Sequence, residues 1–172
     1  MVRFADGRVS SGTRDRDEVR RLYEVHGRAL LAYACAFLHD ASEAEDVLHQ
    51  VFLQLLRDGG TEISSAGYLF RAVRNRVLNH LRGRSREAPL DEALNDRAQW
   101  LEDPSGSTEA ALALQSALST LPVDQREVIV LRVWGQLTFQ EVASIVGVSP
   151  NTAASRYRYG LAKLSEIWHG RT

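Results

Sequence analysis

The polar residues between positions 149 and 162 are the part of this chain best suited to molecular recognition. Asn, Ser and Arg recur there at helical spacing, and Arg can fork onto guanine while Asn can pair with adenine. We expect one face to point outward, made of Asn151, Ser155, Arg158, Tyr159 and Ala162. Arg156 lies on the flank of this face. The opposite face is expected to be buried: Ala153, Tyr157, Gly160, Leu161 and Leu164. Such a helix suits the major groove of DNA, although an ordinary polar surface helix has a similar composition.

The residues just before this helix carry the signals needed to position it. Thr138 and Glu141 have the spacing of a capping box, in which each side chain satisfies a backbone donor at a helix start. Gly147 supplies a tight turn, because glycine takes positive φ freely. Ser149 and Pro150 are an N-cap and a preferred first helical residue. A short helix, a tight turn and a second helix predict a helix-turn-helix.

Charge is distributed unevenly along the chain. The formal net charge is only −1, but residues 71–86 contain six Arg and no acid. Residues 87–109 follow with seven Asp or Glu and one Arg. A basic helix followed by an acidic connector indicates different binding partners for the two segments.

Hydrophobic periodicity predicts an all-α protein of two small helical domains joined by a flexible acidic linker, the second domain being the helix-turn-helix. The predicted divisions are 1–15 (a disordered N-terminus), 16–84 (the first domain), 85–106 (the linker) and 107–172 (the second domain). We expect further helices at about 19–37, 41–57, 66–84, 108–119 and 123–134. The third of these should bury Tyr68, Leu69, Ala72, Val73, Val77, Leu78 and Leu81.

Several functional classes find little support in the sequence. The single cysteine, Cys35, excludes a disulfide framework and suits a reducing cytoplasm. With His39 it would give a metal only two ligands, so no metal and no cofactor is expected. There is no phosphate-binding glycine loop and no arrangement typical of nucleophilic catalysis, so an enzyme is not expected. The sequence contains no apolar run of 18 or more residues, so stable membrane insertion is not expected.

Four stretches together resemble bacterial RNA polymerase sigma factors of the extracytoplasmic-function (ECF) class. They are AEDVLHQVF (44–52), GYLFRAVRNRVLNHLR (67–82), LPVDQREVIVLRVWGQLTFQEVASIVGVS (121–149) and NTAASRYRYGLAKL (151–164). Each motif alone is moderately specific, but their order and spacing are highly specific. The resemblance implies a protein that binds core RNA polymerase and directs it to promoter DNA.

For the first domain, the resemblance implies two binding surfaces. One docks on the clamp helices of the largest polymerase subunit through Asp46, His49, Gln50 and Leu53, where His49 and Gln50 depart from the family's usual residues. The other binds and opens the −10 element through Arg71, Arg74, Asn75, Arg76, Asn79 and Arg82. The loop at 59–65 would read a flipped base.

For the second domain, the resemblance implies recognition of the −35 element by the helix that follows Ser149. The residues implied are Asn151, Thr152, Ser155, Arg156, Arg158 and Tyr159. Ala154, Tyr159 and Leu161 replace residues that are often basic in the family, so the promoter sequence does not follow from the motif. The acidic linker would thread the polymerase's RNA channel, and an anti-sigma factor is an expected partner.

Two other functions remain open at this point. The first is a free-standing helix-turn-helix transcriptional regulator whose N-terminal helices sense a signal or dimerise. The second is an adaptor that binds only proteins, such as an antagonist of sigma factors. The six Arg of residues 71–86 favour the sigma factor, because a sensor domain has no need of them.

Overall fold

The computed structural model describes residues 9–38, 40–58, 65–87 and 109–169, which contain seven α-helices and no strand. The helices are α1 (Val9–Cys35), α2 (Ala41–Arg57), α3 (Ala66–Glu87), α5 (Glu109–Ser119), α6 (Val123–Val133), α7 (Phe139–Val146) and α8 (Pro150–His169). The predicted all-α fold is confirmed, and α2 has the predicted bounds. Most of the predicted linker, residues 88–106, lies outside the described ranges, and residues 85–87 belong to α3.

The first helix is longer than its apolar stripe suggests. It begins at Val9, inside the segment expected to be disordered, of which residues 1–8 lie outside the described ranges. Asp17 and Arg21 are opposite charges at i and i+4 spacing, which favours a helix in this polar stretch. Once the buried part of α1 has formed, extending it toward Val9 costs little per residue because the nucleus already exists.

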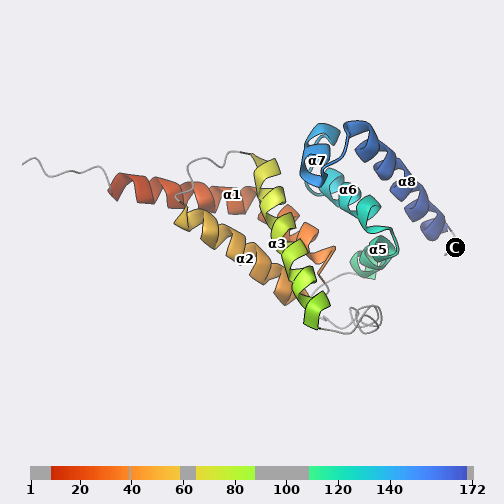
Figure 1. Ribbon diagram of the computed structural model, residues 1–172, viewed down its shortest axis with the longest axis horizontal. Helices are drawn as coiled ribbons and strands as arrows, with labels where there is room; N and C mark the ends of the chain where they lie inside the picture. Colours follow the sequence, from red (N-terminus) through yellow and green to blue (C-terminus); the bar gives the residue numbers. More distant parts are fainter. Residues whose placement is uncertain (1–8, 39, 59–64, 88–108, 170–172) are drawn as a thin grey trace, which may run out of the picture.

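Helices α1 to α3 form the N-terminal unit, in which both α2 and α3 pack against α1 (Figure 1). Asp40 begins α2 by accepting a hydrogen bond from the Ser42 backbone N–H at 2.7 Å. The predicted apolar face of α2 is buried in full: Ala44, Val47, Leu48, Val51, Phe52 and Leu55. Leu69, Val73 and Val77 of α3 complete this core.

The burial of two aromatic residues of α3 differs from the prediction based on hydrophobic periodicity. Tyr68, expected in the core, is 47% exposed. Phe70, outside the expected stripe, is fully buried, because it lies between Tyr33 of α1, whose ring it meets edge to face at 6.2 Å, and the C-terminal helices. A Cβ atom at Gly135 would lie 3.1 Å from the Phe70 ring, so the absence of a side chain there permits the close approach.

Helices α5 to α8 form the C-terminal unit. Its tightest contact is between α6 and α8, where a Cβ atom at Gly160 would lie 2.6 Å from Ile129 Cδ1. This contact orients α8 so that Ala153 and Gly160 are buried, as predicted. Leu161 was predicted to be buried but is 40% exposed. It is one residue beyond Gly160, and a helix turns about 100° per residue, which takes its side chain out of the contact.

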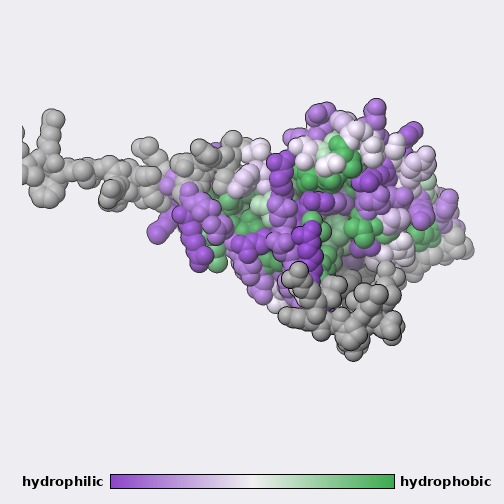
Figure 2. Space-filling model, viewed as in Figure 1, coloured by the Kyte–Doolittle hydropathy of each residue, from purple (hydrophilic) through white to green (hydrophobic). Residues whose placement is uncertain are grey.

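The two units share one continuous apolar core. Helix α3 packs against α7, and α1 packs against α6 (Figure 1). Tyr33 and Phe70 from the first unit belong to the same buried cluster as Val128, Leu131 and Leu137 from the second. Figure 2 shows apolar residues in the seam between α3 and the C-terminal helices, while hydrophilic residues cover the outward faces of α2 and α3.

The packing at Gly160 gives a test of the α6–α8 contact. We expect Gly160→Leu to lower the free energy of unfolding by about 1–3 kcal/mol, because the added side chain overpacks against Ile129. Gly83→Leu is the matched control, since a Cβ atom at Gly83 meets nothing within 4 Å. Urea denaturation followed by circular dichroism measures both, and equal stability of the two variants would contradict this packing.

Candidate nucleic-acid interface

The helix-turn-helix is held by hydrogen bonds at both ends of its first helix. Glu141 Oε2 accepts from the Thr138 backbone N–H at 2.7 Å, and Thr138 Oγ1 accepts from the Glu141 backbone N–H at 3.2 Å, which completes the predicted capping box. Gly147 closes α7 in the left-handed region, with φ 77°. Ser149 Oγ then caps α8 by accepting from the Thr152 backbone N–H at 3.1 Å. The predicted signals for this motif are therefore confirmed.

Helix α8 presents a polar face to solvent. Tyr159 is 65% exposed, and Asn151, Thr152 and Arg158 are also exposed. Arg158 Nη2 lies 3.5 Å from Ser155 Oγ, one turn earlier on the same face. Arg156 is half-buried and its Nε lies 3.1 Å from Asp124 Oδ2 of α6, so it joins the two helices. The structure brings the predicted −35 residues together on α8, with Arg156 turned toward α6.

Aromatic and arginine side chains fix α7 relative to α6 and α8. The Arg132 guanidinium lies 4.7 Å from the centre of the Phe139 ring, and Arg132 Nη1 also donates to the Leu137 carbonyl. On the other side, the rings of Phe139 and Tyr157 meet edge to face at 5.6 Å. The three helices therefore hold the exposed face of α8 on a rigid support.

Helix α3 carries the second set of candidate residues. At 3.6 residues per turn, Arg71, Asn75, Asn79 and Arg82 share one face, and Arg74 and Arg76 flank it on opposite sides. Asn75 is exposed. The arginines contact other parts of the chain: Arg71 Nη2 donates to Ser144 Oγ of α7 at 2.8 Å, Arg76 to Gln50 of α2 at 3.1 Å, and Arg82 to Asn79 at 3.4 Å. Arg74 is paired with Glu127 of α6 at 2.7 Å, so this set is divided between an open face and contacts with three other helices.

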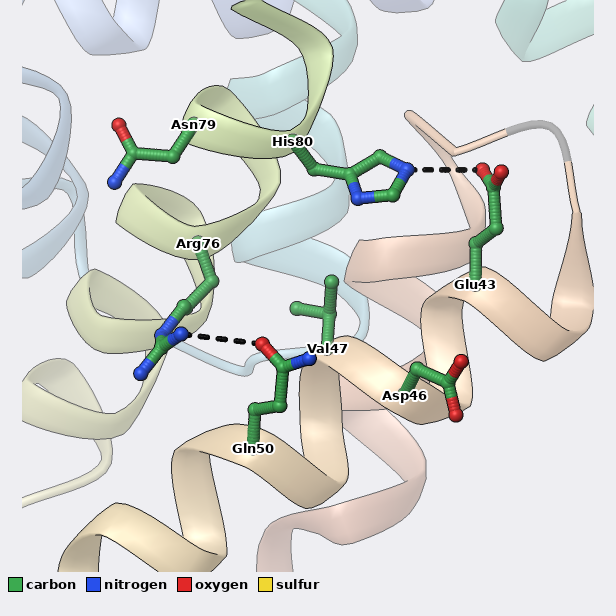
Figure 3. Close-up of a pocket in the computed structure, with 7 residues that line it drawn as sticks. All are labelled: Glu43, Asp46, Val47, Gln50, Arg76, Asn79 and His80. Carbon is green, nitrogen blue, oxygen red and sulfur yellow. Dashed lines mark hydrogen bonds and ion pairs between the residues drawn. The ribbon is translucent and has the colours of Figure 1, made fainter. Parts of the chain in front are cut away.

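A shallow cavity of about 280 Å³ lies between α2 and α3 (Figure 3). Glu43, Asp46 and Gln50 line it from α2, facing Arg76 and His80 from α3. His80 Nε2 lies 3.2 Å from Glu43 Oε2, and the Arg84 guanidinium lies 3.0 Å from the same oxygen. Two polar pairs therefore join α2 to α3 across the cavity, Glu43 with His80 and Gln50 with Arg76 (Figure 3).

The four predicted polymerase contacts lie along one exposed edge of α2. They are Asp46, His49, Gln50 and Leu53, which recur at i, i+3, i+4 and i+7. Gln50 is held by Arg76, whereas the apolar side chain of Leu53 is 52% exposed. This edge therefore presents a charge, hydrogen-bonding groups and one apolar side chain to solvent.

A buried carboxylate joins the two units, and the sequence patterns did not predict it. Glu127 of α6 is only 8% exposed, and it directly precedes the buried apolar residues Val128–Leu131. Its Oε1 accepts from the Tyr33 hydroxyl at 2.6 Å and from Arg74 Nε at 2.7 Å. Burial, together with the negative charge of Glu127, raises the pKa of Tyr33 well above its ordinary value, so the hydroxyl stays protonated as a donor. One acid within an apolar run was the signal that could have found this contact.

Family comparison accounts for both units. Residues 22–87 match sigma-70 region 2, and residues 111–164 match sigma-70 region 4. The chain is 28% identical over 158 residues to the ECF RNA polymerase sigma factor SigM of Mycobacterium tuberculosis, covering 89% of this chain and 78% of that one. The chain belongs to the ECF sigma factors. It is also 26% identical over 157 residues to the sigma factor SigZ of Bacillus subtilis, covering 88% of each.

Two solved structures share this fold. The chain resembles RpoE of Bartonella quintana, solved with the anti-sigma factor NepR, with a TM-score of 0.68, 22% identity and coverage of 87% of this chain and 96% of that one. It resembles CnrH, solved with the cytosolic domain of CnrY, with a TM-score of 0.66, 20% identity and coverage of 95% and 96%. The likeness concerns the fold.

The family settles the alternatives that the sequence left open. As a sigma factor, the chain acts in promoter-directed initiation of transcription by RNA polymerase. The region 2 match includes the arginine-rich α3, which decides against a free-standing regulator and an adaptor. Within the described ranges, no helix could span a bilayer and no group of three or more His, Cys, Asp or Glu is arranged to hold a metal. His39 and the loop residues 59–64 lie outside those ranges.

The capping box predicts a pH dependence for the sigma factor's helix-turn-helix. Hydrogen bonds from the Thr138 backbone N–H and then its hydroxyl lower the pKa of Glu141 in the folded state. A depressed folded-state pKa adds stability above the unfolded-state pKa, and this stability is lost as the pH falls through the folded-state value. We expect Glu141→Gln, which keeps an acceptor, to remove this part of the acid destabilisation.

Thermal unfolding between about pH 6 and pH 3 measures the effect. Glu166→Gln, at an exposed position on α8, is the charge-matched control. If the melting temperatures of Glu141→Gln and wild type fell equally with pH, the carboxylate would have no such role.

Proposed function

We propose that the two units divide promoter recognition, with α8 reading the −35 element and α3 binding the opened −10 element. The supporting observation for α8 is its exposed polar face on a capped helix-turn-helix. Recognition helices contact base edges with residues near their N-terminal end, which here are Asn151, Thr152 and Ser155, with Arg158 one turn later. Tyr159 is exposed beside them and offers a ring and a hydroxyl.

The role of α3 is supported by its charge and its two asparagines. Holding separated strands requires cations along the backbone and hydrogen-bonding groups for unstacked bases. Arg71 and Arg82 share a face with Asn75 and Asn79, so both kinds of group lie on one side of the helix. Arg74 and Arg76 can extend this surface if they leave their present partners.

The proposed partner on α2 is core RNA polymerase, through its clamp helices. The exposed edge of Asp46, His49, Gln50 and Leu53 combines a charge, hydrogen-bonding groups and an apolar side chain. An anti-sigma factor is a second proposed partner, because RpoE of Bartonella quintana, which has a similar fold, was solved with the anti-sigma factor NepR. We place the protein in the cytoplasm, where its polymerase is, and assign it no enzymatic activity, cofactor or metal.

Transcription in vitro with purified core polymerase tests the proposal as a whole. Genomic fragments from the source organism supply candidate promoters, and sequencing of the RNA 5′ ends locates the start sites. Core polymerase with this chain should initiate at specific sites, while core polymerase alone should not. If no fragment supported initiation, the proposal would be refuted.

Arg158 gives a test of −35 reading. We expect Arg158→Ala to cost roughly 1–3 kcal/mol of promoter affinity if its guanidinium forms a bidentate contact with a base. Lys163→Ala removes the same charge from an exposed position on the same helix and is the matched control. Run-off transcription on a set of −35 variants measures the preference. An unchanged preference would show that Arg158 reads no base.

Asp46 gives a test of the polymerase surface. We expect Asp46→Arg to weaken binding to core polymerase without unfolding the domain, since the residue is exposed on α2. Glu24→Arg makes the same charge reversal at an exposed position on α1. Gel filtration with core polymerase follows co-elution, and circular dichroism follows helix content. Normal co-elution of the Asp46 variant would place the interface elsewhere.

A further inference from the structure

We propose that Glu127, Tyr33 and Arg74 form a latch that holds the free sigma factor closed and competes with nucleic acid for Arg74. The inference rests on the proposed role of α3 in DNA binding. The latch joins α6 of one unit to α1 and α3 of the other. In this contact Arg74, a proposed DNA-binding residue, is paired with Glu127 and faces the interior of the protein.

The geometry at Glu127 imitates a phosphate contact. Arg74 Nε and Nη2 approach the two carboxylate oxygens at 2.7 and 3.4 Å, which is the fork arrangement that arginine uses for carboxylate and phosphate alike. The Tyr33 hydroxyl adds a third hydrogen bond at 2.6 Å. The side chains of Arg74 and Glu127 are only 22% and 11% exposed, so a phosphate cannot reach Arg74 while the pair is intact.

Other contacts across the same seam reinforce the closed arrangement. Arg71, also a proposed DNA-binding residue, donates to Ser144 Oγ of α7 at 2.8 Å. Arg126 of α6 donates to the carbonyl of Ala36 at 3.2 Å, and its guanidinium lies 5.6 Å from the Phe37 ring centre. Phe70 packs at Gly135. Polar and apolar contacts therefore act together at this interface.

Promoter binding requires this seam to open. Elements at −10 and −35 are about 25 base pairs apart, which is roughly 85 Å of duplex at 3.4 Å per base pair. In the closed form α3 and α7 are joined by a direct hydrogen bond, and α8 follows α7 after one turn. A helix of 20 residues such as α8 is only about 30 Å long, so α3 and α8 cannot reach both elements at once.

Removing one charge of the latch favours opening for a physical reason. A buried ion pair contributes modestly while intact, because desolvation offsets attraction, but one unpaired buried charge is strongly unfavourable. In Glu127→Gln, Arg74 keeps its charge and loses its partner ion. Separating the units returns Arg74 to water and relieves that cost.

A distance measurement on the full chain tests the latch. Spin labels are placed at Arg57→Cys on α2 and Lys163→Cys on α8 in a Cys35→Ser background, since both label positions are exposed. Pulsed electron–electron double resonance should give a narrow, short distribution for this parent. Adding Glu127→Gln should broaden and lengthen it, whereas adding Glu166→Gln should not. A broad parent distribution, or no change with Glu127→Gln, would overturn the latch.

A second variant guards against simple misfolding. Tyr33→Phe keeps the buried ring and removes only one hydrogen bond to Glu127. It should shift the distance distribution in the same direction as Glu127→Gln, by less. Circular dichroism establishes that each variant keeps its helix content. If Glu127→Gln loses helix, the parent distribution and Tyr33→Phe decide, and either a broad parent distribution or an unshifted Tyr33→Phe would refute the latch.

Competition with nucleic acid is measured separately. Fluorescence anisotropy of a labelled single-stranded thymidine oligonucleotide, at fixed salt, gives the affinity of the unlabelled full-length proteins. We expect Glu127→Gln to bind the oligonucleotide at least about tenfold more tightly than Glu166→Gln does. The reason is that nucleic acid no longer competes with a charged hydrogen bond from Arg74 to Glu127. If Glu127→Gln opens the protein without raising this affinity, the assignment of Arg74 to DNA fails while the mechanical role of the latch stands.

Discussion

A carboxylate inside an apolar seam constrains how the two halves of this protein meet. Removing a carboxylate from water costs several kcal/mol, so Glu127 is tolerable there only with donors at the correct distances. Tyr33 and Arg74 supply them from two different helices of the N-terminal unit. Apolar contacts such as Phe70 on Gly135 tolerate small displacements, whereas the ion pair does not. The ion pair therefore sets the orientation, and apolar burial supplies most of the area.

This constraint makes the two proposed DNA-binding surfaces unequal. Helix α8 is supported from behind by Phe139, Tyr157 and the Gly160 contact, and its polar face is open to solvent. Helix α3 has its arginines engaged with Ser144, Glu127 and Gln50. The proposed α8 surface is preformed, whereas Arg71 and Arg74 of the proposed α3 surface are released only when the units separate. The energy to separate them has to come from a partner that binds the open form better than the closed one.

The features that sequence alone predicted are those encoded within single elements. The α2 core and the capping box depend on residues three or four positions apart, so periodicity and capping rules were sufficient. Phe70, Tyr68 and Leu161 were misplaced because their burial depends on which helix packs against which. Glu127 could not be assigned a partner, because Tyr33 lies 94 positions away in the sequence and no local rule links them. The residues expected to bind DNA and polymerase were predicted by resemblance, and their roles remain predictions.

The pairing of arginines within the chain also reduces how strongly the basic helix α3 attracts nucleic acid. An unpaired row of arginines binds any nucleic acid through release of counterions, with little regard to sequence. In the closed form Arg74 is neutralised by Glu127, and Arg71 and Arg76 are held by neutral acceptors. Non-specific attraction by α3 is therefore reduced in the free protein, while the polar face of α8 stays exposed. Sequence discrimination improves whenever the non-specific term falls by more than the specific one, so closure favours specificity at the expense of affinity.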